Sequence, residues 1–115
     1  MITFRDIAAN EEVNTYIRRA DESLVRMGYT EHSFAHVTRA ATVAHNILTE
    51  LGYDGRTTEL VRIAGYLHDI GNVINRIDHA QSGAIMAFRL LDRLGMDPGE
   101  IALVISAIGN HDEHT

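Results

Sequence analysis

The sequence contains no cysteine and no lysine. Without cysteine the chain can form no disulfide and can offer no thiolate, so any metal must be held by imidazole and carboxylate groups. Such ligands favour Fe, Mn, Co, Ni or Zn over a soft metal. Without lysine, a phosphate that is held by a side chain must be held by arginine, whose planar guanidinium can bind it through two hydrogen bonds.

Long apolar runs and an excess of positive charge are also missing. No stretch approaches the 18 or more apolar residues of a membrane span, and the N-terminus lacks the order of a secretory signal, so we expect a cytoplasmic protein without membrane contact. The formal net charge is −6. This charge argues against a nucleic-acid polymer as partner, because such binding normally needs a basic face. A small anionic substrate fits, since bound metal ions reverse the local potential.

The length of 115 residues predicts one domain over 1–115, and a hydrophobic content of 45% is typical of a globular chain. Apolar spacing predicts an all-α bundle of about five helices, over roughly 11–27, 33–51, 58–70, 79–94 and from 97 onward. Asn10, Asp78 and Asp97 are predicted N-caps. The second helix is predicted to bury one stripe, which consists of Ala40, Val43, Ala44, Ile47, Leu48 and Leu51.

The doublet His68-Asp69 stands at the end of the third predicted helix. Neighbouring residues on a helix project about 100° apart, so both side chains reach one ion only where the helix ends. His36, His79 and His111 also stand near predicted helix ends, and such ends can meet in one layer of a bundle. Neutral imidazole is a common metal ligand and a carboxylate can bridge two ions, so these residues can build a dinuclear hydrolytic centre.

Each of these residues also has a purely structural interpretation. His68 and His36 could be hydrogen-bonded core histidines, Asp69 could cap a helix, and the remaining histidines could be ordinary helix-end residues. An Asp at a helix C-terminus is opposed by the helix dipole, by about 0.3–1 kcal/mol, which favours a nearby cation. A helix N-terminus disfavours protonated His79 and so favours its neutral, metal-binding form.

The ordered series of histidines resembles the HD-domain superfamily of metal-dependent phosphohydrolases. The resemblance covers about 33–115 and rests on four patterns: His36-Val37, Leu67-His68-Asp69-Ile70-Gly71, His79 before Gly83-Ala84, and Ile108-Gly109-Asn110-His111. It implies an HD-like helical bundle that binds one or two divalent transition-metal ions. By this resemblance one ion is held by His36, His68 and Asp69, and a second by His79 and His111, with Asp69 bridging.

The resemblance also implies a function. The expected activity is metal-dependent hydrolysis of a small phosphorylated compound through a metal-activated water, with nucleotides as the leading substrate class and His68 and Asp69 as catalytic residues. The alternative is a non-catalytic HD-like module that binds a metal, a ligand or a signalling partner. A third interpretation is a plain helical bundle with solvated histidines.

Two departures from the family pattern affect these expectations. Many members carry Lys where this chain has Asn72, so Arg76 is the nearest cationic substitute for binding substrate phosphate, although it could be a merely exposed arginine. The family also closes its first metal site with an Asp from a later helix. We therefore expect the 115 residues to be a C-terminally truncated fragment with an under-coordinated first site, unless Asp112 completes it.

Overall fold

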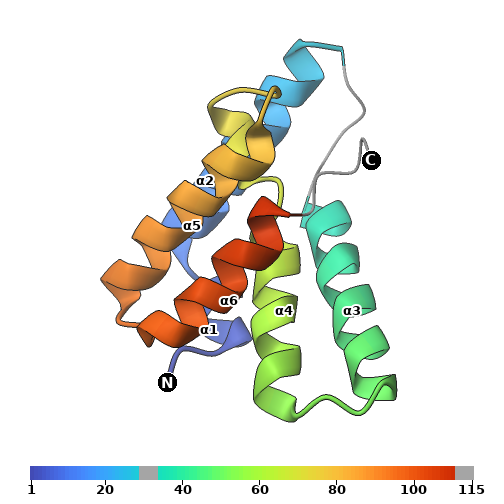
Figure 1. The fold of residues 1–115 in the computed structure, drawn as a ribbon. Helices are drawn as coiled ribbons and strands as arrows, with labels where there is room; N and C mark the ends of the chain where they lie inside the picture. The colour runs from blue at the N-terminus through green and yellow to red at the C-terminus, as the bar shows by residue number, and fades with distance from the viewer. Residues whose placement is uncertain (29–33, 111–115) are drawn as a thin grey trace.

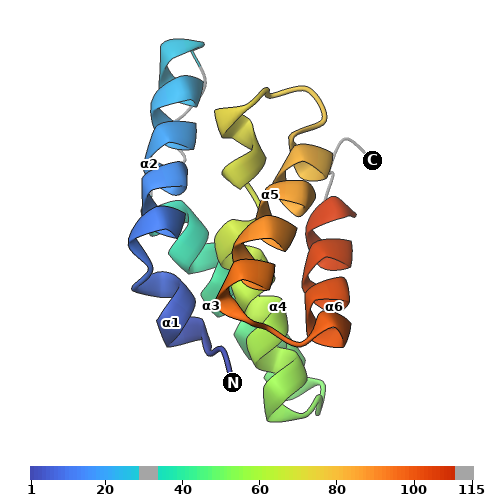
Figure 2. The same cartoon turned by 90° about the vertical axis from the view of Figure 1, so that its left-hand side faces the viewer.

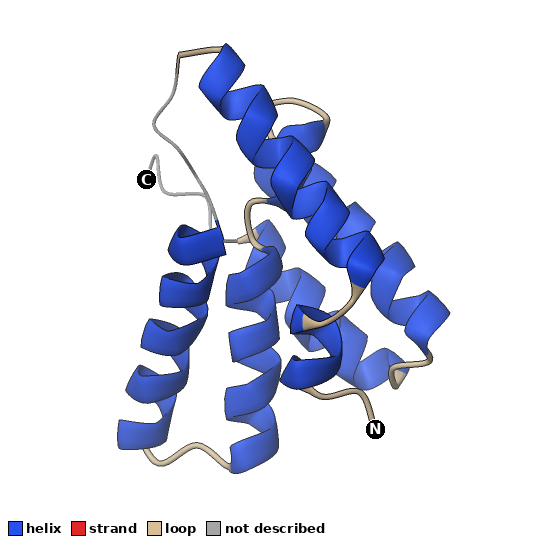
Figure 3. Ribbon diagram, turned by 180° about the vertical axis from the view of Figure 1, so that it is seen from behind, coloured by secondary structure: helices blue, strands red, loops and turns tan. Residues whose placement is uncertain are grey.

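The computed structural model describes residues 1–28 and 34–110, and these residues form a bundle of helices without strands (Figures 1 and 3). The all-α prediction is confirmed for them. None of the described helices has the length and apolar character that a membrane crossing needs. The elements in chain order are α1 (Phe4–Ala8), α2 (Glu11–Arg26), α3 (Phe34–Glu50), α4 (Gly55–Leu67), the 3-10 helix η1 (Ile70–Val73), α5 (His79–Leu94) and α6 (Pro98–Gly109).

Helix α4 lies at the middle of the bundle, with α3 on one side and α6 on the other (Figure 1). Figure 2 shows η1 between α2 and α5, and η1 packs against both helices. Apolar side chains from all of these elements meet in one core, and the largest of those fully buried are Ile7, Leu24, Ile63, Leu67, Ile70, Leu91 and Ile108. This packing directs the C-terminal end of α4, with the doublet, toward α2, α3 and α5.

Side-chain capping explains the starts of several helices. The Asn10 side chain accepts a hydrogen bond from the Val13 backbone, and the Asp97 carboxylate accepts from Gly99 and Glu100, as predicted for N-caps. Asp78 stands at the N-cap position of α5, as predicted, but its backbone is left-handed, with φ of 59°, and its side chain makes no capping bond.

Two other boundaries differ from the prediction. The helix expected over 58–70 runs from Gly55 to Leu67, because the Asp54 side chain caps it three residues earlier and the chain turns into η1 after His68. The short α1 was not predicted. A capping box of Thr3 and Asp6 begins it, but a helix of five residues is too short to show an apolar period.

The stripe predicted to be buried on the second helix is largely exposed, so that prediction was wrong. Val43, Ile47 and Leu51 are 50%, 52% and 67% exposed, whereas Val37 and Ala41 are buried. Only two residues of the stripe, Ala40 and Ala44, line a groove between α3, α4 and α6; its other lining residues are Val61, Ala64, Gly65, His68 and Ala107. Periodicity identifies an apolar face of a helix, but it does not identify the neighbour that covers the face.

Candidate metal centre

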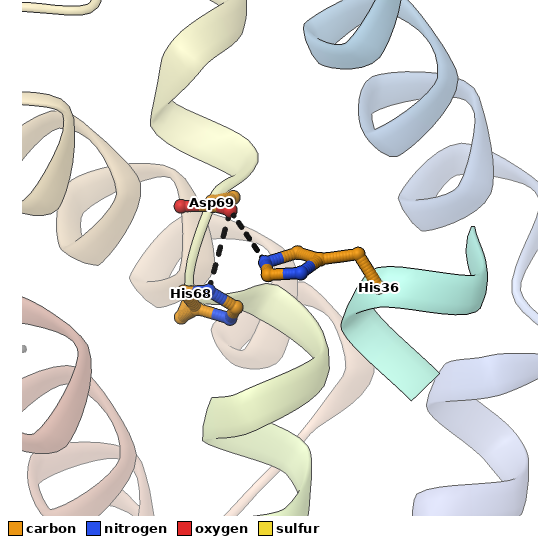
Figure 4. Close-up of side chains that lie close together, drawn as sticks. All are labelled: His36, His68 and Asp69. Carbon is orange, nitrogen blue, oxygen red and sulfur yellow. Dashed lines mark ion pairs between the residues drawn. The ribbon is translucent and has the colours of Figure 1, made fainter. Parts of the chain in front are cut away.

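The Asp69 carboxylate lies at a meeting point of three histidine side chains. Nε2 of His36 lies 3.2 Å and Nε2 of His68 lies 3.3 Å from Oδ2 of Asp69. On the other carboxylate oxygen, Oδ1, Nε2 of His79 lies at 3.4 Å. Figure 4 shows the first two imidazoles pointing at the same carboxylate from different helices.

Four chain segments supply these groups. His36 stands in the first turn of α3, His68 is the C-cap of α4, Asp69 follows at the start of η1, and His79 opens α5. The exposed fraction of the side chains falls from 35% for His36 and 18% for His68 to 10% for Asp69 and 8% for His79. The centre is therefore a recess whose side chains are more exposed on the side of α3 and more buried on the side of α5.

A close crossing of α3 and α4 brings His36 to His68. A β-carbon at Gly65 would lie 3.0 Å from the Ala41 Cα and 3.1 Å from its nitrogen, so only a glycine fits without a shift of α3. The fully buried Ala41 presents the smallest side chain to this contact. The His36 and His68 rings consequently lie with their centroids 5.3 Å apart.

A second and closer crossing brings His79 to Asp69. A β-carbon at Gly71 would overlap the backbone carbonyl of His79 and would lie 2.5 Å from the Gly83 nitrogen. Those are backbone atoms of α5, which cannot rotate away as a side chain can. Gly71, which follows His68-Asp69-Ile70, therefore allows η1 to contact the first turns of α5. The motif alone did not explain why a glycine stands at this position.

Backbone carbonyls orient two of the imidazole rings. Nδ1 of His68 donates to the Gly65 carbonyl at 2.6 Å, and Nδ1 of His79 donates to the Arg76 carbonyl at 3.1 Å. The proton on Nδ1 leaves a lone pair on Nε2 of the neutral ring, and that lone pair faces the Asp69 carboxylate. Two lone pairs at such a separation need a proton or a cation between them, so the arrangement fits a metal ion.

The donor set also fits the expected metals. One ligand atom from each of His36, His68 and Asp69 can be chosen so that all three lie within 4.8 Å of one another, close enough to surround one ion. Imidazole and carboxylate together suit Fe, Mn, Co, Ni or Zn. His79 faces the other carboxylate oxygen, where a bridging carboxylate would meet a second ion.

One predicted ligand, His111, lies outside the described residues, as does Asp112. The described end of α6 nevertheless lies near the start of α5, since the Gln81 side chain donates to the Gly109 carbonyl at 2.9 Å. On the side of α2, Asp69 borders a cavity of about 10 Å³, space for about one water, lined otherwise by Ile17, Ala20, Leu24, Val37 and Ile70.

Asn72 and Arg76 form a further part of the site. Asn72 is fully buried, and its amide donates to the Asp69 carbonyl at 2.9 Å. The half-buried Arg76 donates from Nη1 to Oδ1 of Asn72 at 3.3 Å. Sequence reasoning treated Asn72 only as the loss of a lysine; the signal for its structural contact was its position three residues after Asp69, within one helical turn.

Comparisons with known proteins found a matching family and distant relatives of this chain. The family model of the HD domain matches residues 33–115. An uncharacterized protein of Methanocaldococcus jannaschii is 26% identical over 106 residues, which span 79% of this chain and 41% of that protein. A ribonuclease Y of Opitutus terrae is 30% identical over 88 residues, which span 76% of this chain and 15% of that protein. The chain thus spans less than half the length of either relative, and no solved structure matches it.

Proposed function

The chain belongs to the HD-domain family, and we propose that it is a metal-dependent phosphohydrolase acting on a small phosphorylated compound, with nucleotides as the leading class. The family consists in general of metal-dependent hydrolases. The observation that carries the proposal is the Asp69 carboxylate, buried and faced by three imidazoles at 3.2–3.4 Å. A plain bundle with solvated histidines would not gather these groups in one recess.

In this proposal His36, His68 and Asp69 would hold one divalent ion, and His79 and His111, with Asp69, would hold a second. A bound ion supplies a Lewis acid for the phosphoryl oxygens and lowers the pKa of a water to near neutrality. The chain contributes the orientation of the rings, because carbonyl acceptors direct Nε2 of His68 and His79 into the recess. His68 and Asp69 are the catalytic pair, and Arg76 binds the substrate phosphate.

Two observations support the proposed substrate class: the net charge of the chain and the name of one relative. The relative from Opitutus is named a ribonuclease, and its name supports a phosphoester as the bond that is cleaved. The net charge of −6 favours a small substrate over a polymer. We propose that the enzyme acts in the cytoplasm.

The test measures both the metal content and the hydrolytic activity of the protein. Untagged protein is purified under metal-replete conditions, its metals are measured by mass spectrometry, and hydrolysis of a generic phosphoester and of nucleotides is followed with Mn²⁺ or Co²⁺. Asp69→Asn keeps the shape of the side chain but removes its charge, and we expect loss of bound metal and a fall in kcat/KM of about 1,000-fold or more, since the ion supplies several kcal/mol.

The matched control is His45→Ala, which removes a histidine from the same helix as His36, away from the cluster. Its metal content and activity should equal those of the parent. Hydrolysis that survives a chelator would refute the metal mechanism. A parent that binds metal stoichiometrically but hydrolyses none of the compounds would refute the hydrolase proposal and favour a binding or signalling module.

A further inference from the structure

We propose that the groove between α3, α4 and α6 is the subsite for the nucleobase of the substrate, which is an uncharged, flat ring. The inference rests on the proposed function and assigns a place to the part of the substrate that does not react. The groove measures about 230 Å³. It is continuous with the metal centre, because His68 lines the groove and its imidazole also faces the Asp69 carboxylate.

Two antiparallel helices lead the groove away from the metal centre (Figure 1). Helix α3 carries His36 in its first turn, and α4 ends at His68, so both helices have one end at the centre. Ala40 and Ala44 follow His36 at intervals of four residues on one face of α3, about 6 and 12 Å along its axis. Ala64 lies one turn before His68 on α4. The groove therefore begins beside two candidate metal ligands and extends about two helical turns from them.

Small side chains leave the groove open. Ala40 and Ala44 line it from α3, Ala64 and Gly65 from α4, and Ala107 from α6. None of these residues has a side chain larger than a methyl group. Both α3 and α6 pack against α4, so α4 forms the floor between the other two helices. The described chain thus leaves space for a ligand above α4, next to the metal centre.

The lining favours an uncharged ring over a charged group or a bare sugar. Apart from His68, each described residue that lines the groove is Ala, Gly or Val, whose side chains neither donate nor accept hydrogen bonds. A charged group placed there would lose hydration without compensation. The face of a nucleobase needs only van der Waals contact, and every base has such a face. The described lining can therefore bind a base without distinguishing one base from another.

The length of the groove favours a nucleotide over a simple aryl phosphate. In an aryl phosphate the ring is bonded directly to the phosphate oxygen, whereas in a nucleotide a ribose separates the base from the phosphate. Ala40 and Ala44 lie one and two turns along α3 from His36. With the phosphoryl group at the metal ions, a ring that is carried on a ribose suits these positions.

Binding of phosphonate analogues to zinc-loaded protein tests the inference. In these analogues carbon replaces the bridging oxygen, so they bind without being hydrolysed. We expect the analogue of adenosine monophosphate to bind about tenfold more tightly in calorimetry than the analogue of ribose phosphate, which lacks the base. The uridine analogue should bind within about fivefold of the adenosine analogue. Ala44→Leu fills the groove, and it should reduce the ratio of the adenosine and ribose affinities to about one.

Ala102→Leu is the matched control, because it adds the same side chain to an exposed position of α6 that does not line the groove. It should leave the ratio at its parental value. In the parent, NMR of isotope-labelled alanine methyl groups should show that Ala40 and Ala107 shift with the adenosine analogue and not with the ribose analogue. If Ala44→Leu does not fold, Ala107→Leu fills the groove from α6 and should give the same loss.

Equal affinities of the adenosine and ribose analogues would overturn the inference, as would a ratio that both groove-filling variants leave unchanged. Alanine methyl signals of the groove that do not respond to the adenosine analogue would also overturn it. That last result is expected if a second copy or another segment of the protein covers the groove.

The proposed function can fail separately from the subsite. A parent that binds the adenosine analogue with this dependence on the groove but hydrolyses no nucleotide would support the subsite and refute the hydrolase. A parent that hydrolyses adenosine monophosphate and ribose phosphate with equal kcat/KM would support the hydrolase and refute the subsite.

Discussion

The two halves of the recess around Asp69 are built differently. On the α5 side, η1 and the first turn of α5 meet backbone to backbone at Gly71, and His79 is 8% exposed at its side chain. On the α3 side, one contact between Gly65 and Ala41 fixes the approach, and His36 is 35% exposed. Beyond that contact α3 presents Val43 and Ile47 at its surface. The comparison indicates that the half formed by η1 and α5, the inner half, is rigid. The half formed by α3, the outer half, can move.

The strongest test of the inner half is Gly71→Ala. Its β-carbon would overlap the His79 carbonyl, and neither η1 nor α5 can shift without disturbing Leu91 and Ile108 in the core. We expect a loss of about 3 kcal/mol or more in the free energy of unfolding, measured by urea denaturation. Gly28→Ala is not a suitable control, because Gly28 has a φ of 89°. Gly55→Ala is suitable, since its β-carbon meets nothing within 4 Å, and a loss as large there would refute the close-crossing explanation.

Gly65→Ala tests whether the outer half yields. The new methyl group would meet Ala41 at 3.0 Å, while the helix interior gains about 1 kcal/mol from replacing glycine. Because α3 can move outward, we expect the free energy of unfolding to stay within about 1 kcal/mol of the parent. The displaced His36 should nevertheless weaken metal binding several-fold, measured by titration against a competing chelator. Unchanged metal affinity would mean that His36 is not a ligand.

The smallest effect is expected on the exposed face of α3, where two isosteric substitutions on one helix can be compared. Val43→Thr should change the free energy of unfolding by less than about 0.5 kcal/mol, because Val43 is half exposed. Val37→Thr places a hydroxyl at a site that is 2% exposed and should cost about 1–3 kcal/mol. Equal losses in thermal or chemical denaturation would show that the face of Val43 is covered in solution.

Much of the local structure followed from the sequence. Asn10 and Asp97 begin helices because a short polar side chain can accept from backbone N–H groups two or three residues onward, and this needs no tertiary neighbour. The extent of α5, residues 79–94, was predicted from apolar spacing and from Asp78 at its start. The position of His68-Asp69 at a helix end was likewise a local property, and it led to the candidate metal centre.

Only the tertiary structure decided which face of α3 is buried and how near Gly71 comes to His79. Both depend on atoms supplied by another element: Ala41 of α3 against Gly65, and α5 against η1. A periodic pattern records the polarity of a face but not its neighbour. The sequence by itself thus determined the helices and the candidate ligands, and tertiary packing decided how those ligands converge on Asp69.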